Sequence, residues 1–126
     1  EMARLAHTSV QQVLAAPAET ALAMAKQLDA VVVLKGHRTL TATPAGRLYE
    51  NRTGNAGLAR GGSGDVLAGM IAGLAAQGLA PAQAAVCGVY LHGLAADRCA
   101  GGLSRQGMLP EYILADLCAL YLENGR

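Results

Sequence analysis

Glycine is concentrated in one segment of the chain, directly before an apolar stretch that begins at Val66. Glycines occupy positions 57, 61, 62 and 64 of this segment, and Asp65 follows them. Because glycine has no Cβ, successive backbone N–H groups can approach an anion closely, and a helix that begins near Asp65 adds unpaired donors and the positive end of its dipole. We therefore predict a phosphate-binding turn at this point. Its members are Gly61, Gly62, Ser63 and Gly64.

Asp65 is unusual at such a turn, because a carboxylate repels phosphate unless it has a specific task. It could cap the helix, hold Mg²⁺, or accept a proton from an attacking hydroxyl while the N–H groups stabilise the transferred phosphoryl group. We interpret Asp65 as that general base. The alternative is that Gly64-Asp65 is only a turn and a helix cap. Other phosphate motifs fail on spacing, since Met70 and Leu67 stand where a P-loop and a dinucleotide fingerprint need Lys and Gly.

The elements that must position this turn are short strands and longer helices. Residues 31–34 are β-branched and aliphatic, which is typical of a strand buried on both faces. Residues 40–43 and 47–50 flank Pro44-Ala45-Gly46 and predict a hairpin. Residues 51–64 are predicted to be a loop.

Capping residues and prolines predict the helices. The expected ranges are 8–14 or 9–14, 17–28, 66–77, 81 to about 99, and 110 onward. We expect Gly69 and Gly73, four residues apart, to allow close packing of the third of these against another helix. His92 is expected to be a histidine with satisfied hydrogen bonds in helix packing.

The composition narrows the class of protein. The chain has 126 residues, of which 52% are hydrophobic and 15% charged, with a formal net charge of +1. This length suits one α/β domain, and the small charge argues against a nucleic-acid partner. The longest apolar stretches fall short of the ~20 residues of a membrane span, so no membrane is expected. No metal-ligand spacing relates the three cysteines, Cys87, Cys99 and Cys118. We therefore predict that their thiols are buried and that no side chains form a metal site. Free thiols also indicate a reducing, cytoplasmic location.

The pattern of residues 51–69, N-x-x-G-N-x-G-x-A-x-G-G-x-G-D-V-L-x-G, is similar to that of the ADP/ATP-dependent NAD(P)H-hydrate dehydratases, which are ribokinase-like proteins. The likeness covers nearly the whole chain. Lys35-Gly36-His37-Arg38-Thr39 resembles the family's K-G-x-x-T segment, and Thr43-Pro44-Ala45-Gly46 its T-P-x-G hairpin. Residues 88–95 resemble its G-V-x-L-H-G-x-A helix.

This resemblance implies an enzyme of metabolite repair, which uses ADP or ATP to dehydrate hydrated NADH or NADPH by phosphorylation of the ring hydroxyl and loss of phosphate. Gly64 would contact the phosphate, and Asp65 would face the hydrate hydroxyl as base. Asn55 would support phosphate or Mg²⁺, and Mg²⁺ would offset phosphate charge. The residues that would line the nucleotide site are Lys35, Gly36, His37, Arg38 and Thr39.

The resemblance also implies a fold. It is α/β, a ribokinase-like three-layer αβα architecture, of which residues 1–126 are the C-terminal part, with a mixed sheet and a following helical segment. Because the family's domain is roughly twice this length, we expect weak or no turnover from these residues alone. We also expect self-association into a homo-oligomer, because an incomplete sheet exposes an edge.

Two other functions stay open at this point. A small-molecule kinase of the same superfamily would use Asp65 and the glycines identically but would release a phosphorylated product. A nucleotide-binding module without turnover would need no base at position 65. Nothing in the pattern decides between ADP and ATP, or between the hydrates of NADH and NADPH.

Overall fold

The computed structural model describes residues 1–124. The chain forms two compact units, of which the first comprises Glu1–Asn51 and the second begins at Arg52. The boundary falls directly after the last strand, so the sheet belongs to the first unit and the longest helices belong to the second.

Helices α1 (Met2–Leu5), α2 (Val10–Ala15) and α3 (Pro17–Leu28) open the first unit. Ser9 caps α2, because its hydroxyl accepts the Gln12 N–H and the Gln12 side chain completes a capping box. Pro17 begins α3 as predicted, and Asp29 ends it in the left-handed conformation. Helix α1 was not predicted, since it is a single turn without a side-chain cap.

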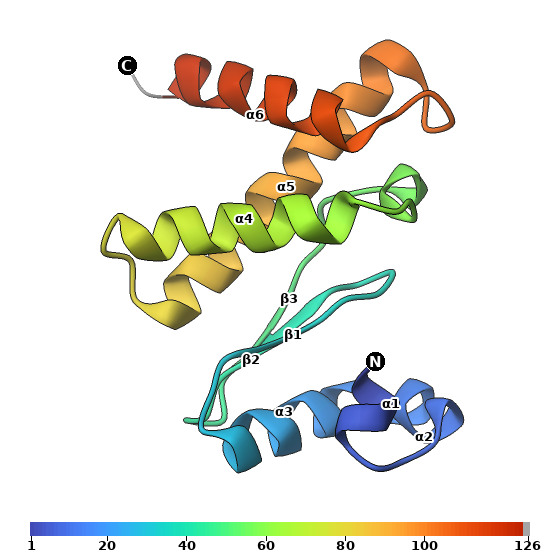
Figure 1. Cartoon of the computed structure of the whole chain (residues 1–126), viewed down its shortest axis with the longest axis vertical. Helices are drawn as coiled ribbons and strands as arrows, with labels where there is room; N and C mark the ends of the chain where they lie inside the picture. Colours follow the sequence, from blue (N-terminus) through green and yellow to red (C-terminus); the bar gives the residue numbers. More distant parts are fainter. Residues whose placement is uncertain (125–126) are drawn as a thin grey trace. The chain divides into compact units, whose positions relative to one another are not determined.

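Strands β1 (Val32–Leu34), β2 (Leu40–Ala42) and β3 (Leu48–Glu50) form a sheet in that order (Figure 1). Both pairings are antiparallel, with Thr41 opposite Val33 on one side and Tyr49 on the other. The hairpin prediction is confirmed. The expected mixed sheet is not found among these strands, because their connections are too short for the crossover that parallel pairing requires.

The core of the first unit lies between α3 and the sheet. Ala21, Met24 and Ala25 of α3 are buried against Val32 and Ala42 of the strands. All of β2 is buried, but β1 is an edge strand in which only Val32 is buried. The expected burial of residues 31–34 on both faces is therefore wrong for this structure.

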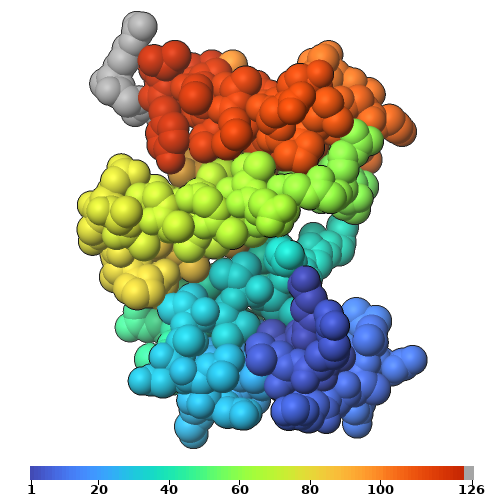
Figure 2. Space-filling model, viewed as in Figure 1, coloured from blue at the N-terminus to red at the C-terminus, as the bar shows by residue number. Residues whose placement is uncertain are grey.

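The second unit contains the one-turn helix η1 (Ala56–Leu58) and helices α4 (Ser63–Ala76), α5 (Pro81–Leu103) and α6 (Pro110–Asn124). Helix α4 begins earlier than predicted, and α5 continues beyond Cys99. Helix α5 packs against both α4 and α6 (Figure 1), and the surfaces of α4 and α6 also lie against one another (Figure 2). None of the helices in residues 1–124 combines the length and apolarity that a membrane crossing requires.

Close packing in the second unit depends on glycines of α5 rather than on those of α4. A Cβ at Gly69 or Gly73 would have no atom within 4 Å, so the expectation for these positions is wrong. A Cβ at Gly88 would lie 2.6 Å from Ile71 Cγ1, and one at Gly93 would lie 2.2 Å from Thr53 Oγ1. The periodicity of α4 did not show which of its faces is covered.

The cysteines differ from the expectation of three buried thiols. Cys99 is buried, and this burial raises the pKa of its thiol. Cys87 and Cys118 are exposed. Cys87 lies outside the arc of α5 that carries Ala84, Gly88 and His92, which explains its exposure.

Candidate functional site

The glycine-rich turn precedes α4 and leaves backbone donors unused. Gly62 is the N-cap residue, with φ 91°, and no side chain caps this end of the helix. The Ser63 N–H donates to the Arg60 carbonyl at 3.3 Å and the Val66 N–H to the Gly62 carbonyl at 3.1 Å. The N–H groups of Gly64 and Asp65 have no hydrogen-bond acceptor anywhere in residues 1–124. Two adjacent donors at the positive end of a 14-residue helix are thus available to an anion.

Asp65 lies in the first turn of α4, and its side chain is exposed. It makes no hydrogen bond or ion pair with any residue that the structure describes, and it does not cap its own helix. The alternative that Asp65 serves only as a cap is therefore wrong, because Gly62 occupies that position. The carboxylate is available to a ligand at the turn.

Asn55 is the N-cap of η1 and is already engaged within the protein. Its Nδ2 donates to the Ala96 carbonyl and to Asp97 Oδ1, both at 3.0 Å. Its Oδ1 accepts the Gly57 N–H at 2.9 Å. These contacts use both hydrogens of the side-chain amide, so in this structure Asn55 shapes the loop and has no side-chain N–H to offer a phosphate.

His92 of α5 is buried, with 6% of its surface exposed, and its Nε2 has no hydrogen-bond partner among the described residues. The expectation of a satisfied histidine is therefore wrong for this atom. Burial lowers the pKa of His92, and a hydrogen bond with the backbone of Ser63 opposes that effect. Burial thus favours the uncharged form of His92, which lies next to the first residue of α4.

The second predicted group, residues 35–39, forms the loop after β1 in the first unit. Lys35 Nζ lies 3.9 Å from Glu1 Oε2, and Arg38 Nη1 donates to Glu50 Oε1 at 2.7 Å. The Thr39 carbonyl accepts the Asn51 N–H at 2.9 Å. Gly36 and His37 are exposed. The structure therefore brings residues 35–39 together in one loop of the first unit, and residues 61–65 together in one turn of the second.

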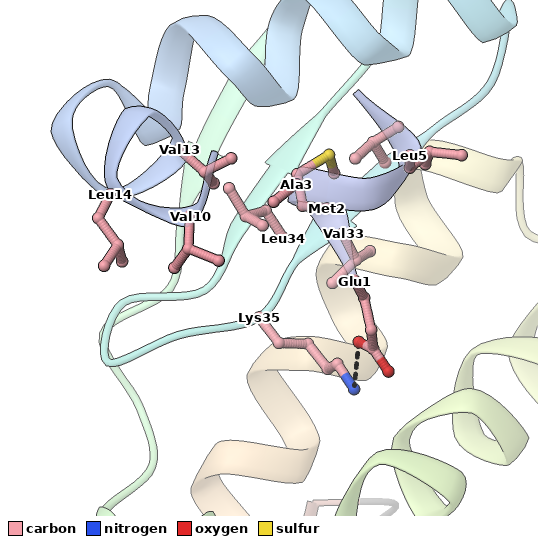
Figure 3. A pocket seen from close by; sticks show the side chains of 11 residues that line it. Glu1, Met2, Ala3, Leu5, Val10, Val13, Leu14, Val33, Leu34 and Lys35 are labelled. Atoms are coloured by element: carbon pink, nitrogen blue, oxygen red, sulfur yellow. Dashed lines mark ion pairs between the residues drawn. The ribbon is translucent and has the colours of Figure 1, made fainter. Parts of the chain in front are cut away.

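A hollow of about 560 Å³ lies in the first unit, lined by aliphatic side chains of α1, α2 and β1. Lys35 and Glu1 meet at its edge, and the side chains of Val10, Val13 and Leu34 line it (Figure 3). This lining is mostly apolar, and Lys35 is its only cationic side chain, so we do not assign the hollow to a phosphate.

Asp97 is the functional candidate that the sequence analysis missed. It accepts hydrogen bonds from the Gly54 N–H and from Asn55, although it lies about 40 residues further along the chain. Its only sequence signal is its place one helical turn after Gly93. No cluster of three or more His, Cys, Asp or Glu side chains suited to a metal ion occurs in the described part of the chain.

Comparison with known proteins identifies relatives across nearly the whole chain. A family profile described as NAD(P)H-hydrate dehydratase matches residues 1–118. The bifunctional NAD(P)H-hydrate repair enzyme Nnr of Moorella thermoacetica is 49% identical over 109 residues, which are 86% of this chain and 21% of that protein. The chain therefore spans about a fifth of the length of this relative.

Two solved structures show the same fold. The crystal structure of the ADP/ATP-dependent NAD(P)H-hydrate dehydratase of Bacillus subtilis, co-crystallised with ATP/Mg²⁺ and soaked with CoA, matches with a TM-score of 0.91 and 36% identity. The match covers 96% of this chain and 45% of that one. A ribokinase-like superfamily protein of Enterococcus faecalis matches with a TM-score of 0.76 and 36% identity over 96% of this chain and 40% of that one. The predicted ribokinase-like α/β class is confirmed.

Proposed function

This chain belongs to the NAD(P)H-hydrate dehydratase family, and on that basis we propose that it takes part in the nucleotide-dependent dehydration of hydrated NADH or NADPH. The observation that carries the proposal is the uncapped N-terminus of α4, where the N–H groups of Gly64 and Asp65 are unpaired beside an exposed carboxylate.

The turn would bind the phosphoryl group that is transferred. The N–H groups of Gly64 and Asp65 would donate to its oxygens, and the dipole of α4 would stabilise the negative charge that builds up during transfer. Gly61 and Gly62 would let the backbone approach closely, since neither has a side chain. Ser63 has a buried side chain and an N–H that already donates to the Arg60 carbonyl, so it would hold the shape of the turn.

Asp65 would act as the general base. Its carboxylate would take the proton of the ring hydroxyl, and the hydroxyl oxygen would form a bond to the terminal phosphorus of ADP or ATP as the bond to the leaving phosphate oxygen breaks. The carbon–oxygen bond would then break and release inorganic phosphate. Loss of a proton from the neighbouring ring carbon restores the double bond, so the products are NAD(P)H, phosphate, and AMP or ADP.

The loop of residues 35–39 would hold the adenosine and phosphate portions of the nucleotide. Lys35 and Arg38 supply its cations, and Gly36, His37 and Thr39 complete it. Mg²⁺, when bound, would neutralise phosphate charge, and the phosphate oxygens offer the hard ligands that it prefers.

The test is to add ADP or ATP to the full-length gene product with hydrated NADH and to follow the recovery of absorbance at 340 nm. We expect Asp65→Asn to reduce this rate by about 10²–10⁴-fold, the usual contribution of a general base, and to leave the dissociation constant of the nucleotide nearly unchanged.

Asp29→Asn is the matched control, because Asp29 is exposed at the end of α3 and asparagine tolerates its left-handed conformation. We expect this variant to have the wild-type rate. A wild-type protein that consumes nucleotide and accumulates a phosphorylated compound would instead be a kinase. Unchanged activity in Asp65→Asn would remove Asp65 from the mechanism.

A further inference from the structure

Asp97 of α5 contacts the loop that leads into the phosphate-binding turn. Its Oδ2 accepts the Gly54 N–H at 2.8 Å, and its Oδ1 accepts a hydrogen bond from Asn55 Nδ2 at 3.0 Å. The two oxygens of one carboxylate thus bind two consecutive residues of the loop. A carboxylate in this arrangement forms stronger hydrogen bonds than a neutral acceptor.

The same stretch of α5 also packs closely against the start of the loop. Thr53 Oγ1 donates to the Tyr90 carbonyl at 2.9 Å. A Cβ at Gly93 would lie 2.2 Å from Thr53 Oγ1, so the loop passes where a side chain on α5 would otherwise stand. The position of residues 53–55 is therefore set by α5.

The other end of the loop is held by the segment that connects α5 with α6. Arg60 Nη2 donates to the Gln106 carbonyl at 3.0 Å. A Cβ at Gly57 would lie 2.9 Å from Met108 Cε, and one at Gly62 would lie 3.2 Å from Pro110 Cγ. The loop is thus attached before and after η1, and the turn at Gly61–Gly64 follows directly from its second attachment.

We propose that Asp97 is a positioning residue for the phosphate-binding turn: by holding Gly54 and Asn55 against α5, it sets the conformation in which the N–H groups of Gly64 and Asp65 face the transferred phosphoryl group. This inference rests on the proposed function of the turn. It requires the carboxylate itself, because the two donors bind different oxygens of Asp97, and asparagine would replace one of these oxygens by an NH2 group that faces another N–H donor.

The experiment compares Asp97→Asn with Asp116→Asn in the full-length gene product. Asp116 is the matched control, since it pairs with Arg98, the neighbour of Asp97, at 3.2 Å and has no hydrogen bond or ion pair with residues 51–62. Three quantities are measured: the dissociation constants of Mg²⁺-ADP and Mg²⁺-ATP by calorimetry, the amide hydrogen exchange of Gly54 and Gly57, and the melting temperature.

We expect Asp97→Asn to weaken nucleotide binding by about tenfold or more, to raise KM with a smaller change in kcat, and to speed exchange at Gly54. Asp116→Asn is expected to alter only the melting temperature. The proposal is overturned if Asp97→Asn speeds exchange at Gly54 without weakening nucleotide binding, or if both variants weaken it equally.

The two proposals fail in different ways. A wild-type protein that binds nucleotide but does not dehydrate hydrated NADH contradicts the proposed function, and the role of Asp97 is still decided by the dissociation constants. A wild-type protein without affinity for either nucleotide contradicts both.

Discussion

The role of each side chain around the turn depends on which groups it contacts. Asp65 is exposed and unpaired, whereas Asp97 is occupied by two donors of the loop. Asparagine at these positions would have opposite consequences: at Asp65 it removes a proton acceptor, and at Asp97 it removes one attachment of the loop. Residue type alone does not separate these roles.

His92 predicts a pH dependence of stability. Burial lowers its pKa in the folded state, so the unfolded chain binds the proton more readily. The stability that depends on uncharged His92 is present above the unfolded-state value of about 6.5 and is lost as the pH falls below it toward the lower folded-state pKa. We expect the free energy of unfolding to fall between pH 7.5 and pH 5.5, and His92→Gln to flatten that fall in urea titrations.

His7→Asn is the control for this measurement, because His7 is exposed and its φ of 51° suits asparagine. This variant should keep the wild-type pH dependence. A His92→Gln protein with the full dependence would assign it to other titrating groups.

At the scale of elements, the start of α4 depends on the conformation of one glycine. Gly62 has φ 91°, which is unfavourable for any residue with a Cβ, while Gly61 lies outside the left-handed region and has open space beside its Cα. Two adjacent glycines of the same motif therefore differ in whether a residue with a Cβ can replace them.

We expect Gly62→Ala to lower the free energy of unfolding by about 1–2 kcal/mol, the usual cost of this conformation for an L-residue, and to weaken nucleotide binding as the turn shifts. Gly61→Ala is the matched control and should change stability by no more than about 0.5 kcal/mol. Denaturant titration and calorimetry measure the two effects. Equal behaviour of the variants would contradict the role assigned to Gly62.

Helix α5 organises the second unit, which the sequence pattern did not show. It carries His92 against Ser63, Gly93 against Thr53, and Asp97 against Gly54. These residues fall within two turns of one helix: His92 contacts the first residue of α4, whereas Gly93 and Asp97 contact the loop between β3 and α4. The helix thereby supports the candidate site.

At the scale of the whole molecule, the chain covers 45% of the matched Bacillus subtilis dehydratase. We expect the 126 residues alone to dehydrate hydrated NADH weakly or not at all, because groups that the rest of that fold contributes to substrate binding would be absent. The assay at 340 nm, run beside the full-length gene product at equal concentration, checks this. Equal rates would show that these residues suffice.

Local signals in the sequence determined where several helices begin and where the hairpin turns. Pro17, Pro81 and Pro110 begin helices where predicted, and the hairpin around Pro44-Ala45-Gly46 has the expected antiparallel pairing. These features depend on φ restrictions and capping within a few residues, so they can be read along the chain. The glycine pattern likewise predicted the turn that precedes α4, where the structure leaves the N–H groups of Gly64 and Asp65 unpaired within residues 1–124.

Only the tertiary structure decided which side chains are available there. It placed Asp97 of α5 against the loop and engaged the side chain of Asn55 in hydrogen bonds within the protein. It also left Nε2 of His92 without a partner among the described residues, and it assigned close packing to Gly88 and Gly93 instead of Gly69 and Gly73. Each of these outcomes depends on a contact between residues far apart in the chain or on which helix face is covered. Periodicity does not specify such contacts, because it describes one element at a time and not the surface against which that element packs.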